Sequence, residues 1–275
     1  MKNTIILATD TLIARTYIQA LKDAGMEPGL VVFLQIIPSG QSRVKSLLKD
    51  LKAKIKSFLK KSPPLPSWLP VFGKYCKAQE LFFPDYRKEF ATLLRESGFK
   101  YRTVRSTGVD DPSLIRLLES QVKEKFIVFC CGGMILRDPI LNGSKRFIHV
   151  HPGLVPEVKG SDGMLWSSLI YKKVGMSAFF MNAGIDTGDI LKRKEYPIPK
   201  LPIEADNCDL ASMADEFVRY IDPVYRANLL VELFQDEEEP GNWKMEKQDP
   251  ESGKVFYFMD KQLKEIAGQR FLKSL

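Results

Sequence analysis

The first half of the chain alternates short apolar runs with longer segments in which apolar residues recur every three or four positions. Short runs of this kind are typical of buried parallel strands, and the longer amphipathic segments predict helices. The predicted strands are Ile5–Ala8, Leu30–Ile36, Tyr101–Val104, Phe126–Cys131 and Phe147–His151. Alternating strands and helices predict an α/β fold with a mostly parallel sheet covered on both faces.

Local stop and start signals mark the helices of this half. The predicted helices are Leu12–Ala24 before Gly25, residues 43–61 before a proline-rich stretch, residues 85–97, and a helix that starts at Pro112. Proline suits the first turn of a helix, and Asp110 or Asp111 would cap the last of these helices. The regular βα rhythm is interrupted only between residues 43 and 80, where we expect an insertion.

The second half predicts fewer strands and more helix. A helix over 163–173, strands over Ser177–Asn182 and Ile190–Tyr196, and one long helix or two over 208–236, interrupted near Pro223, are expected. Trp243–Met245 and Val255–Phe258 are expected to form a hairpin before a last helix. We therefore expect a main domain over residues 1–205 and a small carboxy-terminal extension over residues 206–275.

Composition narrows the class of protein without identifying it. The chain has 275 residues, of which 44% are hydrophobic and 27% charged, as in ordinary globular proteins. No apolar run reaches the roughly 18 residues of a membrane span. The four cysteines lack the spacing of a metal finger. We expect a cytoplasmic protein with reduced thiols.

The positive charge is concentrated in one segment. Residues 43–61 hold eight Lys or Arg against one Asp, which accounts for the whole net charge of +7. A balanced remainder argues against a nucleic-acid-coating protein, so no nucleic-acid partner is expected. The segment is either a solvated helix face or a surface for peripheral contact with anionic lipid or an anionic substrate.

Both histidines of the chain lie in one predicted strand, as His149 and His151. Residues two apart in a strand project from the same face, and ligands of open α/β sheets bind beyond the carboxyl ends of the strands. Downstream, Asp186 lies in a glycine-rich turn between two predicted strands. A carboxylate beside an imidazole raises its basicity and fixes its orientation. The three side chains are therefore the candidate chemical centre.

The region Phe126–Leu191 resembles the folate-dependent formyltransferases, which include glycinamide ribonucleotide transformylase, methionyl-tRNA formyltransferase and the amino-sugar N-formyltransferases. The resemblance rests on His149-Val150-His151-Pro152-Gly153-Leu154-Val155-Pro156, then Gly160, then Asp186-Thr187-Gly188. A segment before it, Cys131-Gly132-Gly133-Met134-Ile135-Leu136, is similar to the family segment that lines the pterin pocket. The resemblance implies a Rossmann-like sheet of the formyltransferase type and 10-formyltetrahydrofolate as co-substrate.

The resemblance also implies roles for single residues. His151 matches the catalytic histidine and Asp186 the catalytic aspartate, while His149 stands where the family has asparagine. A histidine N–H can replace the asparagine amide as donor to the formyl oxygen. Gly153 stands where the family has serine. The residues expected to bind the folate are Gly133, Met134, Ile135, Leu136, Asn182, Gly184 and Ile185. No metal is needed.

Two other readings of the histidine pair stay open at this point. His149, His151 and Asp186 could form a two-histidine, one-carboxylate metal site. Alternatively, His149 could have converted the chain into a folate-binding homologue that lacks turnover.

The expected acceptor is a small-molecule amine, first a nucleotide-linked amino sugar of polysaccharide biosynthesis and second a hydroxyornithine-type amine. The 70 residues after 205 are short and include an acidic run, which disfavours a tRNA-binding domain. A homodimer is a further expectation.

Aromatic side chains are candidates for stacking on a sugar or base. Trp166, Phe179, Phe180 and Tyr257 are available for this purpose, but we expect each of them to belong to the core. The first βα turn, Ala8-Thr9-Asp10-Thr11, lacks the glycines with which a dinucleotide fold approaches a pyrophosphate. No nicotinamide or flavin dinucleotide is therefore expected.

Overall fold

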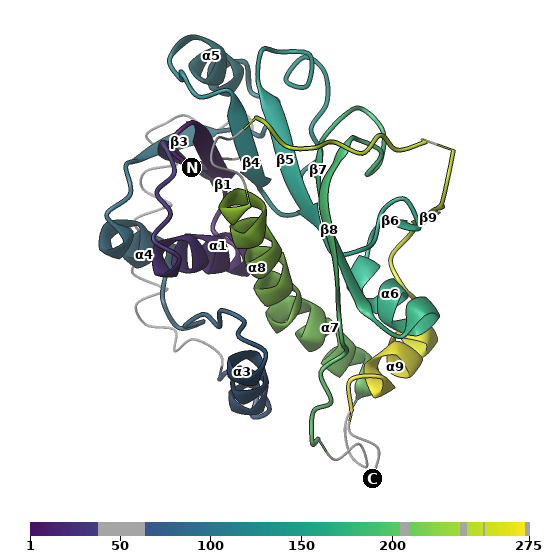
Figure 1. Ribbon diagram of the computed structural model, residues 1–275. Coiled ribbons are helices and arrows are strands. Elements are labelled where there is room, and N and C mark those ends of the chain that lie inside the picture. Colours follow the sequence, from purple (N-terminus) through teal and green to yellow (C-terminus); the bar gives the residue numbers. More distant parts are fainter. Residues whose placement is uncertain (38–63, 204–208, 237–240, 250, 273–275) are drawn as a thin grey trace.

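A computed structural model describes residues 1–37, 64–203, 209–236, 241–249 and 251–272 of the chain. These residues form one twisted sheet with helices packed against it (Figure 1). The predicted basic helix over 43–61 lies outside the described residues. No helix in the described ranges has the length and apolar character needed to cross a bilayer.

The central sheet has seven strands in the order β3-β2-β1-β4-β5-β7-β8. The first five are parallel, and β5 then pairs antiparallel with β7, which pairs antiparallel with β8. The strands are β1 (Thr4–Ala8), β2 (Leu30–Ile36), β3 (Tyr101–Ser106), β4 (Phe126–Cys130), β5 (Arg146–His151), β7 (Val174–Phe180) and β8 (Ile190–Tyr196). The mostly parallel α/β sheet expected from the sequence is confirmed.

The helices of the first half largely match their predictions. They are α1 (Leu12–Asp23), α3 (Leu69–Ala78), α4 (Phe90–Ser97) and α5 (Pro112–Ser120). The Asp111 side chain caps α5 as expected, with Pro112 in its first turn. Helix α4 starts later than predicted because the Asp85 carboxylate accepts from the Arg87 N–H in a preceding turn. Helix α3 was not predicted, since its proline-rich start suggested an end to helix; Pro70 instead occupies its first turn.

The second half corrects one prediction. The helices of this half are α6 (Gly163–Tyr171), α7 (Leu210–Tyr220), α8 (Asp222–Gln235) and α9 (Lys261–Gln269). The break between α7 and α8 confirms the predicted interruption near Pro223. The predicted hairpin between Trp243–Met245 and Val255–Phe258 was wrong. β9 (Lys254–Phe256) pairs in parallel with β6 (Val158–Gly160) to form a separate two-stranded sheet. The residue after Met245, Glu246, forms an isolated bridge with Ile190 of β8 instead.

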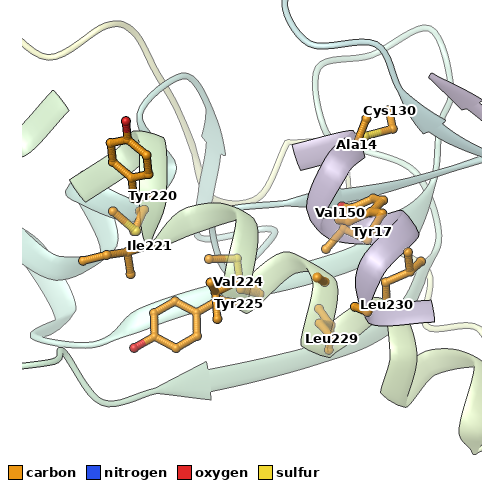
Figure 2. Close-up of a cluster of buried hydrophobic side chains, with 14 of the residues drawn as sticks. Ala14, Tyr17, Cys130, Val150, Tyr220, Ile221, Val224, Tyr225, Leu229 and Leu230 are labelled. Carbon is orange, nitrogen blue, oxygen red and sulfur yellow. The ribbon is translucent and has the colours of Figure 1, made fainter. Parts of the chain in front are cut away.

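Alternate residues of the central strands build two cores. On β1, Ile6 and Ala8 face the larger core, whereas Ile5 and Leu7 face a smaller core under α5. Figure 2 shows part of the larger core, with side chains from α1, α8 and β5 that include Tyr17, Leu230 and Val150. Helix α8 packs against α1 and against strands β5, β7 and β8 of the sheet. The predicted boundary near residue 205 stays a prediction.

Candidate active site

The two histidines project from the same face at the carboxyl end of β5. Their ring centroids are 6.3 Å apart, and both rings contact Phe179 on the neighbouring strand β7. His151 is buried and His149 is partly buried. The Nδ1 atom of His149 is buried without a hydrogen-bond partner among the described residues. An unpaired buried nitrogen is costly in free energy, so it marks a group that a ligand would satisfy.

His151 differs because both of its ring nitrogens face acceptors. Nε2 lies 3.0 Å from the carbonyl oxygen of Val158, and Nδ1 lies 3.3 Å from Oδ2 of Asp186. A neutral ring that donates from Nε2 to Val158 turns a lone pair on Nδ1 toward the carboxylate. One added proton between Nδ1 and Oδ2 would convert this contact into an ion pair.

Asp186 reaches His151 from a tight turn that folds back over the histidine face of β5. The Asn182 side-chain oxygen accepts hydrogen bonds from Gly184 N and Thr187 Oγ1, which closes the turn. Asp186 itself has a φ of 51°, a left-handed conformation that aspartate tolerates better than most residues. Its Oδ2 also accepts from Gly160 N at 2.7 Å. Two contacts therefore fix the carboxylate. We call His149, His151 and Asp186 the His–Asp cluster.

Two glycines leave room for the His151 ring. A Cβ at Gly153 would lie 2.8 Å from His151 Nε2 and 2.6 Å from the Val158 oxygen. A Cβ at Gly163 would lie 3.1 Å from the same Nε2 and 2.5 Å from a backbone oxygen. Gly153, where the resembled family has serine, is thus the residue that permits the His151–Val158 hydrogen bond in this chain.

Burial and neighbouring charge determine the protonation of the cluster. Burial, assisted by the positive charge of Arg226, lowers the pKa of His149 to about 3, so this ring is neutral at pH 7. Burial also lowers the pKa of His151, although the Asp186 carboxylate opposes this effect. Burial raises the pKa of Asp186, but the histidines and the Gly160 N–H outweigh it and keep that pKa below its usual value. The resting cluster is therefore two neutral rings and one carboxylate.

Arg226 of α8 is a supporting residue that sequence reasoning missed. Its Nε lies 2.6 Å from Oδ1 of Asp222, and its Nη1 donates to the carbonyl of Val150 at 2.9 Å. Val150 lies between the two histidines, so this buried ion pair holds the end of β5 from the opposite face. The spacing of Asp222 and Arg226 by four residues in a predicted helix was the available signal. The supporting Val158 carbonyl had no signal in the sequence.

The predicted folate-binding residues fall in two loops that follow β4 and β7, the strands on either side of β5. Gly133, Met134 and Ile135 line a depression of about 560 Å³ together with residues 107–112. Ile135 and Ile185 are 70% and 58% exposed, which is unusual for isoleucine.

Two of the predicted folate-binding residues have structural roles in the protein. The Leu136 side chain is buried in the core under α5, so only its backbone is available to a ligand. The Asn182 side chain is used within its own turn. The assignment of these two residues to folate binding stays a prediction, in which Leu136 would contribute through its backbone.

The metal-site alternative can be compared with the geometry of the cluster. One potential ligand atom from each of His149, His151 and Asp186 lies within 4.8 Å of the others. Asp186 Oδ2 is already shared between His151 and Gly160 N, and His151 Nε2 faces Val158. Of the four ring nitrogens, His149 Nδ1 alone is recorded as buried and unpaired. Metal binding would have to replace contacts that the cluster already makes.

Comparison with known proteins identifies the family. Residues 2–207 match the family model described as Formyl transferase. A methionyl-tRNA formyltransferase from Syntrophus aciditrophicus is 32% identical over 106 residues, which are 38% of this chain and 33% of that protein. The cytosolic 10-formyltetrahydrofolate dehydrogenase of Homo sapiens is 32% identical over 102 residues, which are 36% of this chain and 11% of that protein. The matched segments thus span a third or less of these two relatives.

Solved structures support the same fold. A 4-N formyltransferase from Francisella tularensis superposes with a TM-score of 0.52 at 14% identity, over 97% of this chain and 88% of that chain. At this identity the similarity shows the fold alone. Because the family model covers most of the chain and contains the whole His–Asp cluster, this protein belongs to the formyl transferase family.

Proposed function

We propose that this chain is an N-formyltransferase that moves a formyl group from 10-formyltetrahydrofolate to a primary amine of a nucleotide-linked amino sugar. The observation that carries the proposal is the His–Asp cluster, in which a paired His151 lies beside an unpaired His149 nitrogen. The family match supports the reaction class. The name of one matched relative, a 10-formyltetrahydrofolate dehydrogenase, supports the donor.

His149 is suited to stabilise the negative charge that develops on the formyl oxygen. A neutral imidazole carries one N–H, and the His149 ring has the Phe129 backbone as one hydrogen-bond partner and none at its buried Nδ1. The tautomer protonated at Nδ1 would direct its N–H at the formyl oxygen. A hydrogen-bond donor already in place costs no reorganisation during the reaction and is worth roughly 3–4 kcal/mol in known oxyanion sites. His149 therefore takes the role that the resemblance gives to asparagine.

The His151–Asp186 pair is suited to receive the proton of the attacking amine. With Asp186 ionised and His151 neutral, the pair can accept one proton between Nδ1 and Oδ2. The amine nitrogen forms a bond to the formyl carbon, and the carbon–nitrogen bond to the folate then breaks. The proton passes from the amine through the pair to the departing folate nitrogen, so the enzyme returns to its first state.

The amino-sugar acceptor rests on weaker support than the formyl transfer. The solved structure that shares this fold is named as a 4-N formyltransferase, whereas matched curated relatives act, by name, on methionyl-tRNA. The acceptor is tested by supplying purified protein with 10-formyltetrahydrofolate and, in turn, UDP- or dTDP-linked amino sugars, N-hydroxyornithine and methionyl-tRNA. Formylation of methionyl-tRNA in preference to every sugar would overturn this part of the proposal.

Calorimetric titration with 5-formyltetrahydrofolate, a stable analogue of the donor, tests the donor site. Saturable binding at one site per chain is expected. Asp23→Asn, on an exposed residue at the end of α1, serves as the control for purification and folding. A well-folded protein that binds no folate analogue but binds stoichiometric zinc or iron would replace the proposal with the metal-dependent alternative.

A further inference from the structure

Two adjacent aromatic side chains, Tyr257 and Phe258, are the most exposed large apolar residues in the described part of the chain. Tyr257 is 78% exposed and Phe258 is 80% exposed, contrary to the core position expected for Tyr257. Phe179 and Phe180, expected with it in the core, are buried there. Uncovered apolar area on this scale marks sites of interaction.

The backbone that carries the two rings is firmly held. The Trp166 ring packs against Phe256 at a tilt of 32° with ring centroids 4.8 Å apart, and its Nε1 donates to the Tyr257 carbonyl at 2.9 Å. On the other side, Met259 is buried and its N–H donates to the Asp162 carboxylate at 2.9 Å. The chain thus fixes the residues on both sides of the pair and leaves the two rings uncovered. A fixed backbone lowers the entropy that a ligand must remove on binding.

The pair lies close to the His–Asp cluster. Phe256, the residue before Tyr257, is the β9 partner of Gly160 on β6, and Gly160 N is the donor to Asp186. Paired strands lie about 4.8 Å apart and successive Cα atoms about 3.8 Å apart, which places the Tyr257 Cα roughly 10 Å or less from Gly160. The rings therefore lie within reach of a substrate whose reacting end is at Asp186.

We propose that Tyr257 and Phe258 form a platform on which the base of a nucleotide-linked acceptor stacks. This inference rests on the proposed function and specifies how the acceptor is recognised. In such an acceptor a diphosphate and a ribose separate the amino sugar from the base, so the base must bind outside the catalytic cluster.

Aromatic rings bind every base by stacking, and the same strand offers a charge for the diphosphate. Lys254, also on β9, is exposed and forms no ion pair with the residues that the structure describes. Its ammonium group is a suitable neighbour for an anionic diphosphate. The surface around β9 therefore combines the two chemistries that a nucleoside diphosphate requires.

The test is calorimetric titration of the full chain with UDP, dTDP and GDP, and with pyrophosphate as a probe that lacks a base. Wild-type protein is compared with Tyr257→Ala, Phe258→Ala and Tyr257→Phe, and with Ile266→Ala on the exposed face of α9 as matched control. At least one nucleotide is expected to bind, and each alanine variant is expected to weaken it about tenfold or more. Tyr257→Phe, Ile266→Ala and the pyrophosphate affinity should change little.

Other outcomes overturn the platform. These are no binding of any of the three nucleotides, or binding that both alanine variants leave unchanged. A wild-type dimer that becomes monomeric in the alanine variants, as measured by sedimentation velocity, would assign the rings to a contact between copies of the chain. Titration of the same proteins with 5-formyltetrahydrofolate separates the two proposals. Absence of folate binding by the wild-type protein counts against the proposed function, whereas folate binding without any nucleotide binding by the wild-type protein counts against the platform.

Discussion

The His–Asp cluster and the loop over residues 133–136 are both expected to meet the same donor, yet they are built in opposite ways. His151 and Asp186 are surrounded by fixed protein contacts, with Val158, Gly160 and two close glycines around them. The 133–136 loop instead exposes 70% of Ile135 beside an open depression.

This difference suits the cluster to proton transfer and the loop to binding of the donor. Groups that transfer protons must be held within a fraction of an ångström, so the protein supplies their partners itself. A loop that covers an aromatic ligand gains most of its free energy from apolar area, and that area is exposed until the ligand arrives. Changes in the cluster should therefore reduce turnover, whereas changes in the loop should reduce affinity.

The largest effect is expected for Asp186→Asn. The amide keeps the size of the side chain and can still accept from Gly160 N, but it cannot take a proton shared with His151. We expect kcat to fall by about 10²–10⁴-fold, with the affinity for 5-formyltetrahydrofolate changed less than about threefold. Formyl-transfer rates and calorimetry measure the two quantities. Equal loss of both in a folded variant would contradict the division between chemistry and binding.

His149 offers a second comparison, between His149→Ala and His149→Asn. Removal of the donor in the alanine variant should lower kcat by about 10²–10³-fold. Asparagine, the residue of the resembled family, retains an N–H and should stay within about tenfold of wild type. Should His149→Ala remain as active as His149→Asn, His149 would not be a donor to the oxyanion.

His149 also predicts a dependence of stability on pH. Its pKa is about 3 in the folded protein and about 6.5 when unfolded, so the unfolded chain binds more protons between these values. Its contribution is complete above pH 6.5 and is lost as the pH falls toward 3. Denaturant unfolding should show that wild type loses about 2 kcal/mol more than His149→Asn between pH 8 and pH 5. If the unfolding free energies of the two proteins change equally between pH 8 and pH 5, the His149 pKa is not depressed in the folded protein.

The substitution Gly153→Ser tests whether His151 needs the space beside its ring. The added Cβ would lie 2.6 Å from the Val158 oxygen and 2.8 Å from Nε2, so the ring must leave its hydrogen bond or the backbone must shift. We expect a loss of about 1–3 kcal/mol in unfolding free energy and about tenfold in kcat. Ala78→Ser, exposed at the end of α3, is the control for an added hydroxyl. Unchanged activity would show that His151 acts equally well without the Val158 contact.

The smallest effect is expected in the loop. Ile135→Ser removes an exposed apolar side chain and should weaken 5-formyltetrahydrofolate about three- to tenfold, with kcat at saturation and unfolding free energy unchanged. Ile266→Ser is the matched exposed isoleucine away from the loop. An Ile135→Ser variant that loses turnover at saturating donor would contradict the expectation that changes in the loop reduce affinity alone.

The sequence predicts the parallel half of the fold well where strands are buried on both faces, as β1 and β4 are, and where helices have local end signals, as α1 and α5 do. Asp111 and Pro112 start α5 as their residue types require. The histidine pair is equally predictable, since a strand places residues two apart on one face.

The remaining features depend on contacts between distant segments. Nothing local in Lys254–Phe256 indicates that these residues pair with Val158–Gly160 and not with a neighbouring segment. Likewise, the pKa of His149 is lowered first by burial among distant segments and then by the positive charge of Arg226 on α8. The same long-range pairing leaves Tyr257 exposed, although its apolar neighbours predict a core residue.

The pairing of β9 with β6 has a consequence for how the protein is made. Gly160, with a φ of 92°, has no room for a side chain because Phe256 passes over it, and its N–H is the donor that fixes Asp186. A ribosome therefore releases Asp186 long before it releases the segment that packs over Gly160. The strands of the central sheet are thus synthesised first, and the segment that completes the surroundings of the His–Asp cluster is synthesised last. A chain that ends before residue 256 would contain every strand of the central sheet but lack the segment that packs over Gly160, the donor to Asp186.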